Sequence, residues 1–235
     1  MKLNIVSFNT QHCLNYVTRQ IDYEGVAKLI KELDADIVGL NEMRGEGDLP
    51  GYEAQMEKLA ELTGYHYFFA PAIMMGGTSP YGNGLLSRYP IKQAEKIMIP
   101  DPTEKTGKSY YETRCIIKAV IDVAEGLTVM VSHFGLNDDE RFIAVNTLLP
   151  ALEDKKCVFM GDLNTTPEDP VLDGIRDRML DTAEVIGEDK LSFPSDKPVE
   201  KIDYIFTSRD IEVTYADIPE KIVSDHRPYI VKVNI

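Results

Sequence analysis

The sequence predicts an α/β protein in which two mixed β-sheets pack face to face and helices cover their outer sides. Short apolar runs alternate with helical patterns and turn signals along the chain, which indicates both strands and helices. The elements do not follow strict β-α-β alternation, which disfavours a single parallel sheet. No linker, low-complexity tract or internal repeat interrupts the pattern, and 43% of the residues are hydrophobic. We therefore predict one domain, residues 1–235, with a substantial core.

The first third of the chain predicts three strands and two helices. Lys2 to Phe8 and Asp36 to Leu40 are short apolar runs typical of strands. Between them, from Tyr23 to Leu33, apolar residues recur at helical spacing. A second helical pattern, Ala54 to Leu62, leads into an aromatic strand from His66 to Ala70.

The middle of the chain, from Gly84 to Val131, predicts an antiparallel meander. The dipeptide Asn83-Gly84 at its start is typical of a hairpin turn. The four predicted strands of the meander are Leu85 to Ser87, Ile91 to Ile99, Tyr110 to Val123 and Leu127 to Ser132.

The last part of the chain predicts one more helix, Asp139 to Leu152, and four strands. Each of these strands is a short apolar run bounded by polar or turn-forming residues. The strands are Cys157 to Met160, Tyr204 to Thr207, Ile211 to Tyr215 and Tyr229 to Val233.

The charge of the chain disfavours long nucleic acids as substrates. With 25 Lys and Arg against 39 Asp and Glu, the formal net charge is -14 and the sequence pI is about 4.7. This charge opposes the phosphate neutralisation on which non-specific nucleic-acid binding depends. A local basic groove or a bound divalent cation would reverse the sign where it matters.

The sequence predicts a soluble, cytoplasmic protein without membrane insertion. No apolar stretch approaches the roughly 20 residues that span a bilayer, and the start MKLNIVSFNT lacks the apolar core of a secretion signal. Cys13, Cys115 and Cys157 are odd in number and lie in apolar segments, so we expect buried thiols in a reducing compartment. The sequence gives no indication of an oligomeric state.

Several predicted strands end in polar residues that could meet at one rim of the sheets. Carboxylates such as Glu42 and Asp225, with the amide oxygens of Asn9 and Asn164, are ligands suited to Mg²⁺ or Mn²⁺. The remaining polar residues supply acid-base groups: two imidazoles, a carboxylate that could orient one of them, and a carboxylate that could align a water. These residues are His133, His226, Asp203 and Asp162. A metal, an oriented water and a cationic imidazole are the parts needed to hydrolyse a phosphate ester.

Several polar residues in or near these motifs also have a purely structural interpretation. Asp162 and Asn164 could form only an Asx-turn before Pro167. Arg114 lies within a strand pattern, where a structural salt bridge and a phosphate clamp remain open alternatives. His12 follows the Asn9 motif and could line the site, but a packed or surface histidine fits as well.

At these residues the sequence resembles the endonuclease/exonuclease/phosphatase superfamily of metal-dependent phosphoesterases. The resemblance extends from Ser7 to Pro228 and consists of short motifs in a fixed order. The motifs are SFN with Asn9, NE with Glu42, GLLSRYP around Ser87 and Arg88, TRC with Arg114, SHF with His133, GDLN with Asp162 and Asn164, KIDYIF with Asp203, and SDHRP with Asp225 and His226. The resemblance implies a four-layered α/β sandwich whose strand ends surround a divalent ion.

The resemblance also implies a role for each site residue. It implies that Glu42 is the principal metal ligand, with Asn9 and Asp225 nearby. Asp162 would orient or activate the attacking water. The remaining roles are a catalytic Asp203–His226 pair, a further catalytic His133, a catalytic and phosphate-binding Asn164, and substrate binding by Asn9 and Arg114.

We therefore expect an Mg²⁺-dependent phosphodiesterase or phosphomonoesterase that acts on a small or exposed phosphate ester, with Mn²⁺ as a substitute metal. The alternative is an endonuclease or exonuclease of DNA or RNA from the same superfamily. A third possibility is a non-catalytic binding domain on the same scaffold, but such a domain typically lacks one or more site groups, and here none is missing.

Overall fold

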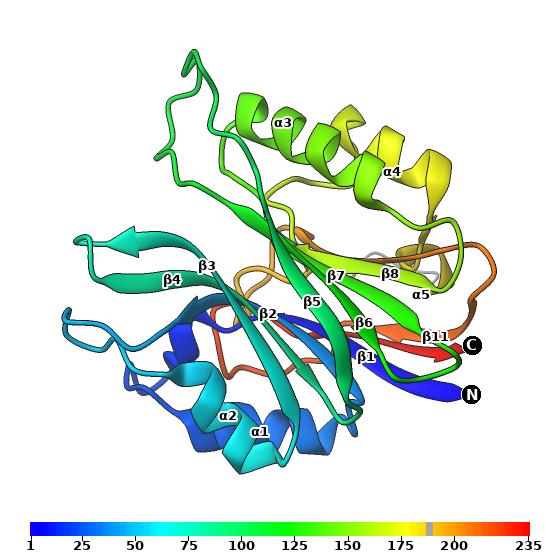
Figure 1. The fold of residues 1–235 in the computed structure, drawn as a ribbon, viewed down its shortest axis with the longest axis horizontal. Coiled ribbons are helices and arrows are strands. Elements are labelled where there is room, and N and C mark those ends of the chain that lie inside the picture. The colour runs from blue at the N-terminus through cyan, green and yellow to red at the C-terminus, as the bar shows by residue number, and fades with distance from the viewer. Residues whose placement is uncertain (187–189) are drawn as a thin grey trace.

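The computed structural model describes residues 1–186 and 190–235 and contains two six-stranded mixed sheets that pack face to face. Helices α1 and α2 cover the outer side of one sheet, and α3 and α4 cover the outer side of the other (Figure 1). The four-layered α/β sandwich predicted from the sequence is thereby confirmed.

The first sheet has the strand order β11-β12-β1-β2-β4-β3. Strands β1 and β2 are parallel, and every other pair in this sheet is antiparallel. Its strands are β1 (Lys2–Asn9), β2 (Ile37–Arg44), β3 (His66–Met75), β4 (Ser79–Ser87), β11 (Glu212–Asp217) and β12 (Tyr229–Asn234).

The second sheet has the strand order β5-β6-β7-β8-β10-β9. Strands β7 and β8 are parallel, and the other pairs are antiparallel. Its strands are β5 (Ile91–Met98), β6 (Cys115–Ile121), β7 (Leu127–His133), β8 (Cys157–Asp162), β9 (Leu180–Asp181) and β10 (Asp203–Thr207).

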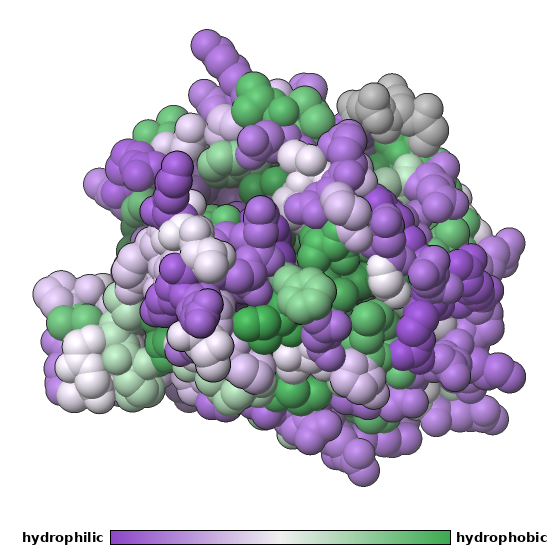
Figure 2. Space-filling view, turned by 90° about the horizontal axis from the view of Figure 1, so that it is seen from above, coloured by the Kyte–Doolittle hydropathy of each residue, from purple (hydrophilic) through white to green (hydrophobic). Residues whose placement is uncertain are grey.

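The helices are short, and none in the described part of the chain is long and apolar enough to cross a bilayer. Seen from above the second sheet, hydrophilic side chains cover most of the molecule, and apolar side chains gather over α3 (Figure 2). The helices are α1 (Tyr23–Glu32), α2 (Gln55–Thr63), α3 (Asp138–Leu148), α4 (Asp173–Arg178) and α5 (Ala183–Ile186), with 3₁₀ helices η1 (Gln11–Cys13), η2 (Leu149–Ala151) and η3 (Pro170–Leu172).

The alternation of side chains along the strands builds three apolar layers. In β1, Leu3 and Ile5 point into the layer between the sheets, whereas Val6 and Phe8 point toward α1 and α2. A third layer fills the space between the second sheet and α3 and α4. Every residue from Cys157 to Asp162 in β8 is buried, because this strand has the inter-sheet layer on one side and the helices on the other.

Strand register brings the polar strand ends to one rim of the sandwich. Asn9 of β1 is level with Asn41 of β2, next to Glu42. Asp162 of β8 is level with His133 of β7 and with Asp203 of β10. His226 lies three residues before Tyr229, the first residue of β12, which pairs with Ser7 near the end of β1. The site is therefore shared between both sheets.

The structure corrects three predictions made from the sequence. Asn83-Gly84 is not a hairpin turn but lies inside β4, which begins at Ser79 and belongs to the first sheet rather than to the meander. The turn falls instead at Gly76 and Gly77, where φ is +59° and +82°. The predicted strand start at Tyr110 is wrong, because β6 begins only at Cys115.

Candidate active site

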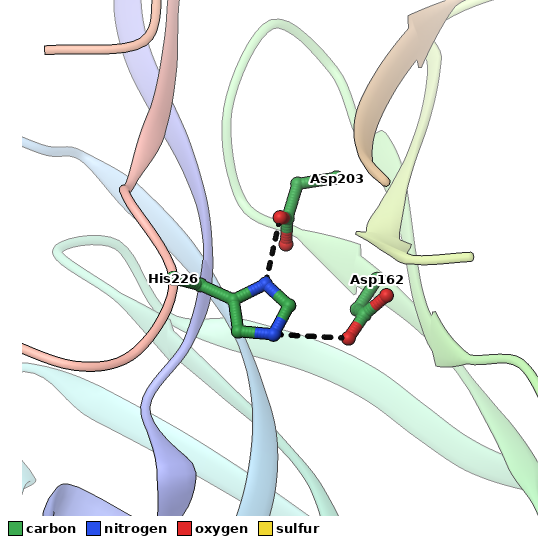
Figure 3. A group of neighbouring side chains, drawn as sticks. All are labelled: Asp162, Asp203 and His226. Carbon is green, nitrogen blue, oxygen red and sulfur yellow. Dashed lines mark hydrogen bonds and ion pairs between the residues drawn. The ribbon is translucent and has the colours of Figure 1, made fainter. Parts of the chain in front are cut away.

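A buried histidine lies between two aspartates at the centre of the rim (Figure 3). His226 Nδ1 is 2.8 Å from Asp203 Oδ2, and His226 Nε2 is 3.6 Å from Asp162 Oδ2. The ring also packs on Phe193, with 4.8 Å between the ring centroids. The Asp203 contact fixes the orientation of the imidazole, and its other nitrogen faces the site.

The pKa values of His226 and Asp162 are both raised, but for different reasons. Burial alone would lower the pKa of His226, but the negative charges of Asp203 and Asp162 raise it above its usual range. Burial raises the pKa of Asp162, and the His226 charge offsets part of that effect. His226 is therefore a cation at neutral pH and suited to face a phosphate oxygen.

His133 is a buried, neutral imidazole on the other side of Asp162. Its Nε2 is 3.5 Å from Asp162 Oδ2 and 3.0 Å from Asn164 Nδ2, and its Nδ1 is 3.0 Å from Arg114 Nη1. Burial, followed by the charges of Arg114 and His226, holds the pKa of His133 well below its usual value. The imidazole thus lies between Arg114, Asn164 and Asp162.

The turn after β8 positions Asp162 and Asn164 together. Asp162 Oδ1 accepts a hydrogen bond from the backbone N–H of Asn164 at 3.0 Å, so the predicted Asx-turn exists. This bond leaves Asp162 Oδ2 facing the histidines. Asn164 itself has φ +50°, a backbone conformation that costs energy outside glycine and that recurs at functional sites.

Gly161 makes the approach of β8 to β7 possible. Its φ is +149°, and a Cβ at this position would lie 1.8 Å from the carbonyl oxygen of Ser132. Only glycine fits here without moving the strand that carries Asp162.

Glu42 faces the same site from the first sheet. It sits in a register shift of β2 opposite β4, between Leu40 and Met43, and has φ +64°. Such a bulge redirects a side chain at the end of a strand. Burial and the nearby charge of Asp225 raise the pKa of Glu42, and a hydrogen bond from Asn9 opposes this effect.

Asn9 connects the two halves of the site. Its Nδ2 donates to Glu42 Oε1 at 3.1 Å and to Asp162 Oδ2 at 3.0 Å, while its Oδ1 accepts from the backbone N–H of Gln11 at 3.0 Å. The amide nitrogen, rather than the amide oxygen, therefore faces the carboxylates in this arrangement.

The donor set is chemically suited to a hard divalent cation. Glu42 and Asp225 interact electrostatically, and Asp203 Oδ1 is buried without a hydrogen-bond partner among the described residues. Atoms of Asp162, Asp203 and His226 also lie within 4.8 Å of one another. Buried carboxylates that lie close together gain most from a cation that neutralises them.

Two buried amides, which were not predicted from the sequence as site residues, support the site. Asn41 Nδ2 donates to Asn83 Oδ1 at 2.9 Å and to the carbonyl of Ser132 at 3.0 Å, and Asn41 Oδ1 accepts from the backbone N–H of Asp162 at 3.0 Å. Asn83 in turn donates to the carbonyl of Cys115 at 2.9 Å. The two side chains tie the sheets together directly behind Asp162.

Two further residues named from the sequence differ in position: His12 lies at the rim, whereas Arg88 lies away from it. His12 Nδ1 is 4.0 Å from Glu42 Oε2, and burial lowers the pKa of His12 to about 4. Arg88 lies at the opposite end of the sheet, where it pairs with Asp34 and Asp36. The three cysteines are buried and free, as expected.

The fold and the rim define a class of protein: an α/β sandwich whose strand ends gather a histidine–aspartate pair, further carboxylates and amides in one polar site. A sequence profile described as the Endonuclease/Exonuclease/phosphatase family matches residues 6–226. The chain therefore belongs to this family of phosphoesterase hydrolases. No curated protein matches the sequence.

Solved structures with the same fold have diverse names and low sequence identity. An endonuclease/exonuclease/phosphatase from Beutenbergia cavernae DSM 12333 superposes with a TM-score of 0.79 at 20% identity, covering 100% of this chain and 72% of that chain. A mannosyl-6-phosphatase from Bacteroides thetaiotaomicron VPI-5482 gives 0.76 at 16%, covering 99% and 100%. TDP2 from D. rerio, complexed with a single-strand DNA product, gives 0.71 at 18%, covering 100% and 99%.

Proposed function

We propose that this protein is an Mg²⁺-dependent phosphoesterase that hydrolyses a small or exposed phosphate ester by attack of an activated water. The observation that carries the proposal is the arrangement around Asp162, whose Oδ2 lies 3.0 Å from Asn9 Nδ2, 3.5 Å from His133 Nε2 and 3.6 Å from His226 Nε2. A carboxylate surrounded by these groups is suited to hold and deprotonate a water.

In this proposal the residues of the site have different roles in the reaction. Asp162 aligns the water and accepts its proton, which the raised pKa of this carboxyl favours. His226, held cationic by Asp203, stabilises the charge that develops on the phosphoryl oxygens. Asn164 and Arg114 donate hydrogen bonds to the same group, and the His133 ring packs between them.

We propose Glu42 and Asp225 as the residues that hold the metal. When bound, Mg²⁺ would offset the charge of the phosphoryl oxygens, with Mn²⁺ as a substitute. Asn9 remains a proposed third ligand and substrate contact, and a ligand role would require its amide oxygen to leave the backbone N–H of Gln11.

The net charge of the molecule supports a small phosphate ester as the substrate. The formal net charge of -14 disfavours long duplex DNA. The similar structures include one named as a phosphatase and one complexed with a DNA product, which supports both a small phosphate ester and a nucleic-acid end as candidates. We favour the small ester because its binding does not depend on a long basic surface.

A substrate panel tests this proposal. The panel compares bis-p-nitrophenyl phosphate, nucleotides, sugar phosphates, and single- and double-stranded nucleic acid, each with Mg²⁺ and with chelator. We expect Mg²⁺-dependent hydrolysis of one or more small esters. Efficient cleavage of plasmid DNA alone would favour the nuclease alternative, and no hydrolysis of any substrate would favour a binding domain.

A further inference from the structure

A long segment, residues 99–114, connects β5 to β6 and rises beside α3 (Figure 1). We call this segment the strap. It ends at Arg114, directly before β6, where the Arg114 guanidinium contacts His133 of the site. The position of Arg114 depends on what holds the strap.

Side chains at the N-terminal end of α3 hold the strap by several hydrogen bonds; we call this group the clamp. Asp139 Oδ2 accepts from the backbone N–H of Thr106 at 2.9 Å and from the hydroxyl of Tyr111 at 2.7 Å. Asn137 exchanges two hydrogen bonds with the backbone of Ser109, at 2.9 and 3.2 Å. These side chains thus bind the strap in addition to starting the helix.

Glu140 extends the clamp to the end of the strap. Its Oε2 accepts hydrogen bonds from the backbone and side chain of Asn137, the residue that caps α3. Its Oε1 accepts a hydrogen bond from the backbone N–H of Glu112 at 3.2 Å. The backbone of Glu112 is therefore fixed relative to the helix.

The Glu112 carboxylate is the acidic partner of Arg114. Glu112 Oε1 lies 2.5 Å from Arg114 Nη1, and the two side chains are only 15% and 11% exposed. The same Nη1 lies 3.0 Å from His133 Nδ1. A cavity of about 10 Å³ beside the pair, lined by both residues and by Asp101, has room for one water but not for a phosphate.

We propose that Glu112 is a positioning residue for Arg114: its carboxylate, anchored through Glu140 to α3, holds the guanidinium against His133 so that it faces the substrate phosphate. A largely buried ion pair fixes the geometry of the guanidinium more firmly than an exposed pair does, because solvent competes less for it. The proposal rests on the phosphoesterase function proposed above.

A double-mutant cycle tests whether Glu112 acts through Arg114. We expect Glu112→Gln to lower kcat/KM about tenfold, because it weakens one charge-assisted contact. The loss should appear mainly in KM, since the guanidinium binds the phosphate of the bound substrate as well as the transition state. In the Arg114→Ala background, Glu112→Gln should have no further effect.

Thr113→Ala is the matched control in the same strap. It removes the hydrogen bond from Thr113 Oγ1 to Asp101 Oδ2 at 3.0 Å but leaves the Arg114 contacts in place. We expect its kcat/KM to stay within about twofold of the wild-type value. An equal loss from Glu112→Gln in both backgrounds, or no loss in either, would overturn the proposal.

A second measurement separates this inference from the proposed function. The side-chain Nε–H signal of Arg114 in an NMR spectrum of the substrate-free protein reports its restraint without any turnover. We expect this signal to shift and to exchange faster with solvent in Glu112→Gln than in Thr113→Ala. If the wild type hydrolyses no ester, the proposed function fails, and an Arg114 signal unchanged by Glu112→Gln would refute the positioning role independently.

Discussion

The two carboxylate oxygens of Asp162 make different contacts. Oδ1 closes the turn to the backbone of Asn164, whereas Oδ2 faces Asn9 and the two histidines. The side chain is thus oriented by its own chain while its second oxygen faces the site. A substitution that preserves its shape but removes its charge separates these two functions.

Asp162→Asn should therefore abolish hydrolysis and leave the fold intact. The amide cannot accept a proton from water, so we expect kcat to fall by about 10²- to 10⁴-fold. Steady-state kinetics measure the loss, and circular dichroism checks the fold. Asp173→Asn, at an exposed position in α4, is the matched control and should retain wild-type activity. Unchanged turnover in Asp162→Asn would refute the role assigned to this residue.

Lys201 is a buried cation that the proposed mechanism does not use. It is 7% exposed, its Nζ lies 3.5 Å from the centroid of the Tyr204 ring, and it donates to the carbonyl of Asp203 at 3.3 Å. Burial lowers the pKa of Lys201 to about 8, against the opposing charges of Asp181 and Asp203. Burying the charged form therefore costs free energy of folding.

The cost of Lys201 should depend on pH in a defined window. Below pH 8 the lysine is charged in both the folded and the unfolded state, and the cost is fully present. Between about pH 8 and 10.5 only the unfolded state keeps the proton, so stability relative to a neutral side chain rises with pH. We expect the free energy of unfolding of the wild type, minus that of Lys201→Met, to increase by up to about 3 kcal/mol across this window.

Urea denaturation of both proteins at several pH values between 7 and 10.5 measures this difference. Subtracting the Lys201→Met values removes the contributions of other groups that titrate in both proteins. A difference that stays constant with pH would show that burial does not penalise the charged form of Lys201.

At the scale of whole elements, the site depends on how the two sheets are joined at the rim. Asn41 on β2 bonds across the interface to the backbones of β7 and β8, at Ser132 and Asp162. The bulge that follows Asn41 then turns Glu42 into the site. A side chain of the first sheet thus helps to position Asp162 in the second sheet.

Asn41→Ala should destabilise the protein markedly. It removes the three buried hydrogen bonds that Asn41 makes to Asp162, Ser132 and Asn83, which costs about 3 kcal/mol in the free energy of unfolding. Asn146→Ala, which removes an exposed amide from α3, is the control and should change stability by less than about 0.5 kcal/mol. Equal effects of the two substitutions in urea denaturation would contradict the role of Asn41 between the sheets.

The sequence predicted the acidic and imidazole groups of the site better than its amides. Glu42 and Asp162 each lie two residues after an apolar run, and a charged group so close to a core indicates a rim position. Asn41 and Asn83 have no such local signal, since the partners of their side chains lie 32 to 121 residues away. For the same reason the local turn preference of Asn83-Gly84 did not decide the structure, because Asn83 bonds to Asn41 within the first sheet and to Cys115 in the second sheet.

At the scale of the whole molecule, the excess of acidic residues favours cation binding. The formal net charge of -14 draws divalent cations toward the protein, and the rim concentrates Glu42, Asp162, Asp203 and Asp225 in one place. His226 offsets only part of this local charge. The folded protein should therefore bind Mg²⁺ more tightly than the unfolded chain, in which these carboxylates are far apart.

Mg²⁺ should raise the melting temperature through this site, because a ligand that prefers the folded state stabilises it. At a free Mg²⁺ concentration of 100 times Kd, the gain is about 2.7 kcal/mol, which corresponds to roughly 5 to 10 °C for a chain of this length. Differential scanning calorimetry of chelator-treated protein, with Mg²⁺ added at constant ionic strength, measures the shift. Glu42→Gln should remove most of it, whereas general screening of the acidic surface would shift both proteins equally and would contradict a site at Glu42.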